Sequence, residues 1–308
     1  FSGHLYSDRS ERSILYKNLG KNQFQDVSEQ LGLVDTSWSG DATSVDLNSD
    51  GWADLYVLNM QGNDHYYENV EGKKFVDKTD QYFPKTSWGA MGVKFFDHNN
   101  DGFLDLFVTD MHSDMSDFID YDFPLREKLK SIMQFEKSYL VGHEKSIWGN
   151  TFYKNEGEGK FTEVSNSIGV ENYWPWGLSV GDLNSDGFPD IFITSSMNYP
   201  YRYGVNSLLL NNRGETFLDS EFILGVEPRR GGVTIKPWYE LDCSVADKEH
   251  ARCEGYEGAL TVMAAYGSRA SVIFDLDQDG DLDIVTNELN SEPQIFISNL
   301  DEVRDIYF

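Results

Sequence analysis

A nine-residue acidic segment, which we call the Asp loop, occurs four times in this chain of 308 residues. Positions 1, 3, 5 and 9 of each copy are Asp or Asn, and position 6 is Gly. Carboxylates this close together repel one another unless a cation lies among them. Oxygen ligands without Cys or His favour calcium over zinc or copper, and Gly lets the backbone turn around the ion. The copies are DLNSDGWAD from Asp46, DHNNDGFLD from Asp97, DLNSDGFPD from Asp182 and DLDQDGDLD from Asp275.

We expect each Asp loop to bind one Ca²⁺ through the side chains at positions 1, 3, 5 and 9 and the carbonyl of position 7. Three loops supply three carboxylates and an amide, whereas the fourth supplies four carboxylates and should bind tightest. Such ions brace a turn between strands and so serve folding rather than catalysis. The predicted ligands are Asp46, Asn48, Asp50, Trp52 and Asp54; Asp97, Asn99, Asp101, Phe103 and Asp105; Asp182, Asn184, Asp186, Phe188 and Asp190; Asp275, Asp277, Asp279, Asp281 and Asp283.

The EF-hand, which shares the beginning of this motif, is excluded. An EF-hand needs Glu at position 12 and a helix on each side. Position 12 is Val57, Val108, Ile193 or Thr286, and the flanking segments are rich in β-branched and aromatic residues. The Asp at position 9 closes the loop early, so the chain enters a strand at once.

A longer repeat surrounds the Asp loops. An aromatic residue and small residues precede each loop, and a short apolar run follows it. A second motif also recurs, in which an apolar run is followed by Asn, a polar turn and Phe. It predicts a two-stranded hairpin at 14–33, 66–79, 151–170 and 208–226. Four short antiparallel strands per repeat indicate an all-β chain that forms the four-stranded blades of a β-propeller. Gly, Ala and Ser in the first strand suit the crowded innermost position.

The number of blades does not close a ring in an obvious way. Residues 1–33 supply only the outer hairpin of one blade, and four complete blades follow. Closed propellers have four to eight blades. Either a missing partner segment completes a small ring, or the chain is part of a larger one, which we favour. We treat 1–308 as a single propeller domain.

Two inserts interrupt the repeat, because the Asp loops begin 51, 85 and 93 residues apart. The first insert, 111–149, has helical spacing after Pro124 and falls within a blade. The second, 227–265, lies between blades and contains Cys243 and Cys253, the two cysteines of the chain. We expect these to form a disulfide in an exported protein; two reduced thiols are the alternative. Inserts of this size either carry function or brace the scaffold.

Composition limits the compartment and the partners. The net charge of −27 argues against nucleic acid and anionic membranes as partners. No apolar run reaches membrane-spanning length. The first residues, FSGHLYSDRS, are not a signal peptide, so the chain is expected to be mature, trimmed or part of something longer. Together with the predicted disulfide, this favours a secreted or cell-surface protein, extracellular or periplasmic.

The line D-x-[DN]-x-D-G-x-x-D-L-x-V after an aromatic and small residues resembles the FG-GAP/VCBS repeat. That repeat builds the seven-bladed calcium propeller of integrin α subunits and of many secreted bacterial proteins. The LYxNxGxGxFxxV line is similar to propellers of the cartilage acidic protein/UnbV type. The resemblance implies a calcium-bearing propeller and is compatible with a piece of a seven-bladed ring. It does not fix the function, since such propellers serve adhesion, ligand binding and as scaffolds beside enzymes.

Our leading hypothesis is an extracellular calcium-binding propeller that acts as a binding or adhesion module for a protein or glycan at the cell surface. Aromatic residues at 173–176 and 199–203 are candidate contacts. For Trp176 we favour a place in the repeat's own packing, because Trp38 and Trp88 stand in a similar context.

Two alternatives stay open. One is an enzyme or enzyme subunit of the lyase or hydrolase type, with His98, His112, His143 or His250 as acid or base. The other is a structural subunit of a surface assembly, completed by further chains. No nucleophile motif supports the first alternative.

Overall fold

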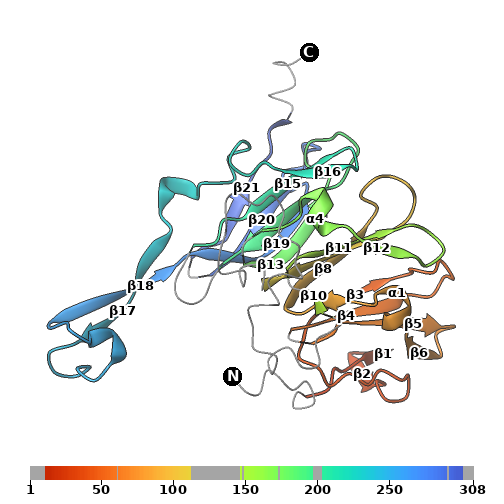
Figure 1. The fold of residues 1–308 in the computed structure, drawn as a ribbon, viewed down its shortest axis with the longest axis horizontal. Coiled ribbons are helices and arrows are strands. Elements are labelled where there is room, and N and C mark those ends of the chain that lie inside the picture. The colour runs from red at the N-terminus through yellow and green to blue at the C-terminus, as the bar shows by residue number, and fades with distance from the viewer. Residues whose placement is uncertain are drawn as a thin grey trace.

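The computed structural model is all-β and describes residues 11–60, 62–111, 146–147, 149–172, 174–196, 203–289 and 291–300 (Figure 1). Its two described α-helices are single turns, α1 (Thr79–Tyr82) and α4 (Ser165–Ile168). No helix in these ranges is long and apolar enough to cross a membrane.

Three four-stranded antiparallel sheets follow one another along the chain, each with its strands in sequence order. They confirm the predicted blade. The first is β3 (Ser39–Val45), β4 (Asp54–Asn59), β5 (His65–Val70) and β6 (Lys74–Asp77). The second is β8 (Ala90–Phe96), β9 (Asp105–Asp110), β11 (Thr151–Asn155) and β12 (Phe161–Glu163). The third is β13 (Pro175–Gly181), β14 (Asp190–Ser195), β15 (Ser207–Asn212) and β16 (Thr216–Asp219).

Two further sheets are partial blades. Strands β1 (Tyr16–Gly20) and β2 (Gln23–Asp26) form an isolated hairpin, as the repeat predicts for the first residues. The fourth blade has β19 (Gly267–Phe274), β20 (Asp283–Leu289) and β21 (Gln294–Phe296). Of the four complete blades that the repeat predicts, three are complete, and the fourth has three strands up to residue 300, where the described part of the chain ends.

The first strand of each blade, which we call the inner strand, packs beside the inner strand of the next blade. Small residues are required where these strands meet. A Cβ atom on Gly92 would lie 2.9 Å from the carbonyl oxygen of Trp176, and one on Gly177 would lie 3.0 Å from that of Arg269. The hydroxyl of Thr109 also donates to the carbonyl of Trp176 at 2.6 Å. The Gly residues of the predicted inner strands therefore have a direct steric cause.

The hydrophobic core lies between successive blades. Strands β9 and β14 are buried along their whole length, since the second strand of a blade is covered on both faces. Phe83, Leu106 and Tyr56 pack between the first and second blades. Phe152 and Ile191 fill the space between the second and third. Burial of these side chains positions the Asp loops at one end of every blade.

The first predicted insert is largely outside the described residues, and so is its predicted helix. At its borders β7 (Thr86–Ser87) pairs in parallel with β10 (Ser146–Ile147). The second insert is a hairpin, not a plain loop. Strands β17 (Ile235–Asp242) and β18 (Ala259–Ala265) pair antiparallel and extend away from the blades (Figure 1). The 3₁₀ turns η5 (Arg230–Gly232) and η6 (Ala251–Cys253) flank β17, and the predicted Cys243–Cys253 disulfide is present beyond its end.

Candidate metal centres

The Asp at position 1 of the first three loops folds the turn by accepting backbone hydrogen bonds. In the first loop the two carboxylate oxygens of Asp46 accept from the N–H of Asp50 at 3.0 Å and of Gly51 at 2.9 Å. Gly51 has φ +87°, a left-handed conformation that favours glycine. Asp97 and Asp182 make the same pair of bonds. The loop conformation is therefore set by the side chains that are predicted to hold the ion.

The Asp at position 9 is buried in all four loops and joins three segments of its blade. Asp54 accepts from the N–H of Leu47 at 3.2 Å, the N–H of Asn69 at 2.7 Å and the hydroxyl of Tyr66 at 2.6 Å. The equivalent carboxylates also accept a backbone N–H from position 2 of their loop and one from the third strand or, in the fourth blade, from just beyond it. These carboxylates are Asp105, Asp190 and Asp283.

The Asn of the motif that predicts the hairpin has a role that the sequence did not reveal. Asn69 donates its amide to the carbonyl of Ala53 at 2.8 Å, and its side-chain oxygen accepts from the N–H of Gly72 at 2.9 Å. Asn155 and Asn211 repeat both contacts in the next two blades. One residue thus connects the Asp loop to the hairpin turn, and its recurrence in the repeat was the available signal.

The oxygen donors of the loops suit a hard cation. The position 7 carbonyls, for example those of Trp52 and Phe103, accept no hydrogen bond from any residue that the structure describes. In the first three loops the position 3 amide donates to the position 5 carboxylate, as Asn48 does to Asp50 at 3.1 Å. Carboxylate, amide and carbonyl oxygens are the kind of donors that calcium takes, and calcium at these loops stays a prediction. The position 7 carbonyls of Phe188 and Asp281 likewise accept no hydrogen bond from a described residue.

The fourth loop differs from the other three. One carboxylate oxygen from each of Asp275, Asp277 and Asp283 lies within 4.8 Å of the others, the one such acidic cluster in the described part of the chain. Burial and the neighbouring Asp279 raise the pKa of Asp277. In the third loop burial, with Asp186 and Asp182 adding to it, raises the pKa of Asp190 to about 6. In both cases burial is the larger cause of the raised pKa, and repulsion from the neighbouring carboxylates adds to it.

The loops are also attached to neighbouring blades. Asn211 of the third blade donates to the carbonyl of His98 in the second loop at 2.7 Å. Asn100 of that loop donates to the carbonyl of Gly187 in the third loop at 2.9 Å. The second and third loops therefore form one connected layer.

The two candidate catalytic histidines that the structure describes have other roles. His98 is buried, and its Nδ1 contacts Asp105 at 2.5 Å, so it belongs to an Asp loop. His250 caps η6 by accepting from the N–H of Arg252. His112 and His143 lie outside the described residues. A pair that was not predicted, His65 with Asp77 at 2.8 Å, lines a pocket of about 450 Å³.

The structure corrects the alignment of Trp176. In each of the first three blades the residue after the second strand donates its N–H to the carbonyl of the residue just before the inner strand. Met60 donates to Trp38, Met111 to Gly89 and Ser196 to Trp174. Trp174, not Trp176, therefore occupies the place of Trp38 in the repeat. Of the other candidate aromatic contacts, 173 and 199–201 lie outside the described residues, and Tyr203 bonds to Glu227.

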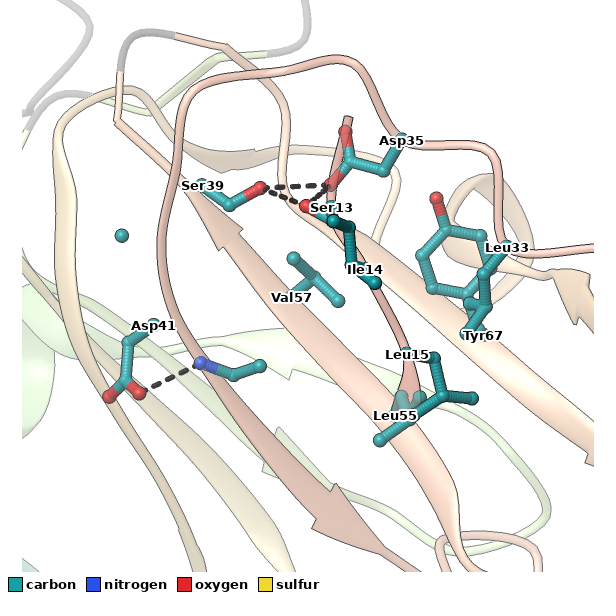
Figure 2. A pocket seen from close by; sticks show the side chains of 12 residues that line it. Ser13, Ile14, Leu15, Leu33, Asp35, Ser39, Asp41, Leu55, Val57 and Tyr67 are labelled. Atoms are coloured by element: carbon teal, nitrogen blue, oxygen red, sulfur yellow. Dashed lines mark hydrogen bonds between the residues drawn. The ribbon is translucent and has the colours of Figure 1, made fainter. Parts of the chain in front are cut away.

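A second pocket of about 300 Å³ lies between residues 13–15 and the first blade (Figure 2). Leu15, Leu55, Val57 and Tyr67 line it, and Figure 2 shows Ser13, Ser39 and Asp35 joined by hydrogen bonds at one edge. Along β3 only Val45 is fully buried, whereas much of β8 and β13 is buried. The first blade thus has a partly uncovered face, as the unclosed set of blades predicts.

Comparisons with known proteins agree with this architecture. Residues 46–108 and 139–193, which contain the first three Asp loops, match the family model of the FG-GAP-like repeat. The chain therefore carries FG-GAP-like repeats. The finer likeness to the cartilage acidic protein/UnbV type stays a prediction.

A search of curated proteins found no match. Among solved structures, this chain aligns with a lectin from Agrocybe aegerita described as recognising non-reducing terminal N-acetylglucosamine. The two share 15% identity, the alignment covers 89% of this chain and 68% of the lectin, and the TM-score is 0.36. A similarity at this level carries no argument about the ligand.

Proposed function

We propose that this FG-GAP-like chain is a calcium-stabilised β-propeller module that binds a protein or glycan ligand outside the cell. The observation that supports it most is the repeated construction of the Asp loops. All four place Asp or Asn oxygens in a turn and end in a buried Asp that connects strands, and in the fourth loop three carboxylates cluster. A repeated, structurally embedded donor set fits a folding ligand better than a catalyst.

A bound calcium ion would attract the loop carboxylates, which repel one another in its absence. The ion supplies positive charge among carboxylates. The side chains at positions 1, 3, 5 and 9 all accept backbone N–H groups, as in the first loop, and with the position 7 carbonyl they are the proposed ligands. The loop is largely formed by its own hydrogen bonds, so the ion should strengthen an existing turn.

The disulfide and the charge support the proposed compartment. The Cys243–Cys253 bond fits an oxidising environment outside the cytosol. A strongly acidic surface suits a soluble extracellular module and disfavours anionic membranes.

The calcium half of the proposal is tested by thermal unfolding of the whole chain in Ca²⁺ and in EDTA. We expect a sharp fall in melting temperature in EDTA that is reversed by Ca²⁺ but not by an equal ionic strength of NaCl. An unchanged melt would refute the calcium role. The binding half is tested on a glycan array and by pull-down from cell surfaces, where a blank result in Ca²⁺ would count against a binding module.

A catalytic alternative has one specific observation behind it, the His65–Asp77 pair in its pocket. His65 is partly exposed and lies over the ring of Tyr67, so its other ring nitrogen is a candidate acid or base. Loss of a detected hydrolase or lyase activity in His65→Asn, with an unchanged melting temperature, would favour this alternative.

A further inference from the structure

The inner strands share a feature outside the Asp loops: each has a β-bulge near its start, at the end away from the loop. Pairing with the second strand shifts between Ser39 and Asp41, Ala90 and Gly92, Pro175 and Leu178, and Ser268 and Ala270. A bulge turns a side chain out of the regular alternation of the strand. Counted back from the Asp loops, the bulged position is held by Gly40, Met91, Trp176 and Arg269.

Two of these bulge residues meet across neighbouring blades. The guanidinium carbon of Arg269 lies 3.5 Å from the ring centroid of Trp176. The indole N–H of Trp176 donates to the carbonyl of Ser196 at 2.7 Å, which fixes the ring. Both side chains stay partly exposed. Since Trp174 fills the structural place in the repeat, Trp176 is free to serve another purpose.

Among the residues that the structure describes, Arg269 has no carboxylate partner. It makes no ion pair or hydrogen bond with any residue that the structure describes, and its Nε is buried without an acceptor. Arg229, by contrast, is paired with Glu288. The chain has 52 acidic and 25 basic residues, so carboxylates are plentiful. A partly buried guanidinium left without one is costly for folding alone, and its two terminal nitrogens are not among the buried unsatisfied atoms, so they can meet a carboxylate from a ligand.

A second polar group beside Trp176 is also unsatisfied. The hydroxyl of Ser196, whose carbonyl holds the indole, is buried and has no hydrogen-bond partner in the described structure. A Cβ atom on Gly267, two residues before Arg269, would lie 2.2 Å from the Cβ of Ser196. Ser196 and the strand that carries Arg269 are therefore in direct contact, and Gly267 permits this approach.

We propose that Arg269 and Trp176 form a binding site for a sugar that carries a single carboxylate, of the uronic acid class. The planar guanidinium matches a carboxylate through two parallel hydrogen bonds. The indole beside it offers an apolar surface to a sugar ring. One unpaired cation suits one negative charge, and the acidic chain repels polyanions. This inference rests on the proposed binding function and names its ligand class.

The test uses the whole chain in Ca²⁺ and isothermal titration with methyl β-glucuronide. Methyl β-glucoside, which lacks the carboxylate, is the control ligand. We expect a dissociation constant of about 1 mM for the glucuronide and affinity at least about tenfold weaker for the glucoside. Arg269→Gln should weaken glucuronide binding by about tenfold or more, and Arg269→Lys by less. Arg230→Gln, at an exposed arginine of η5, is the matched control and should bind as the wild type does.

Tryptophan fluorescence gives an independent readout at the site. Glucuronide should change the emission of the wild type and leave that of Trp176→Phe unchanged. Equal affinity for the two glycosides, or glucuronide binding that survives in Arg269→Gln, would overturn the proposal. Binding of N-acetylglutamate amide without binding of glucuronide would also overturn it, because the ligand would then be a peptide carboxylate and not a uronic acid.

The same samples separate this inference from the proposed function. Their melting temperatures are compared in Ca²⁺ and in EDTA. If Ca²⁺ raises the melting temperature but glucuronide does not bind, the Arg269 site is refuted and the calcium-stabilised module stands. If glucuronide binds but the melting temperature is the same in Ca²⁺ and in EDTA, the calcium role is refuted and the site is supported.

Discussion

Replacing the buried Asp54 with Asn separates the structural role of position 9 from calcium binding. Asn keeps the shape but has one acceptor oxygen, so the N–H of Leu47 or Asn69 must face an amide donor. Losing one hydrogen bond to a charged group costs about 1.5–3 kcal/mol, and the unpaired buried N–H adds about 1–3 kcal/mol. We expect a total of roughly 3–5 kcal/mol, or a fall in melting temperature on the order of 10 °C.

The assay is calorimetric unfolding of the wild type, Asp54→Asn and Asp50→Asn, each in Ca²⁺ and in EDTA. Asp50 is an exposed position 5 residue, so its variant should lose stability in Ca²⁺ and match the wild type in EDTA. Asp54→Asn should be destabilised in both conditions, because its backbone hydrogen bonds do not need the ion. If Asp54→Asn unfolds like the wild type in EDTA, the structural role assigned to position 9 is wrong.

Three further predictions follow from other parts of the chain. Asp277→Asn should weaken the tightest calcium site by about tenfold, seen by calcium titration, because one charged ligand is lost. Cys243→Ser should cost the hairpin roughly 2–3 kcal/mol, detected as faster amide exchange in β17 and β18 while the main unfolding transition stays in place. For His65, burial alone lowers the pKa, but the Asp77 carboxylate outweighs it, and the pKa is raised. The wild type should therefore have a larger free energy of unfolding than His65→Asn, fully so below about pH 6.5, and this difference should disappear as pH rises through the raised pKa. Denaturant unfolding at several pH values measures it, and a pH-independent difference would contradict the pairing.

Much of the fold could be predicted because the repeat combines three kinds of local information. The Asp loop marks the turn, the short apolar runs mark the strands, and the Asn-Gly turns mark the hairpins. The disulfide followed from two nearby cysteines. These signals act within about twenty residues, which is why the sequence reveals them without an alignment.

The errors arose where contacts cross between blades or where register shifts. Trp176 was aligned with Trp38 because both precede small residues, but Trp176 lies two positions nearer to its Asp loop than Trp38 does. The anchoring role of Asn69 depends on a carbonyl in the Asp loop, and spacing alone does not show this. His65 and Asp77 meet across a hairpin and carry no motif. The second insert lacked turn signals strong enough to predict its hairpin.

The buried Asp at position 9 also has a consequence for folding kinetics. It joins its loop to the third strand over 15 residues at Asp54 and 21 at Asp190. In the second blade the corresponding contact, from Asn155 to Asp105, spans 50 residues because the first insert intervenes. Closing a longer loop costs more entropy and slows the formation of contacts. The first and third blades should therefore form early, and the second blade, between them, should be the last to close.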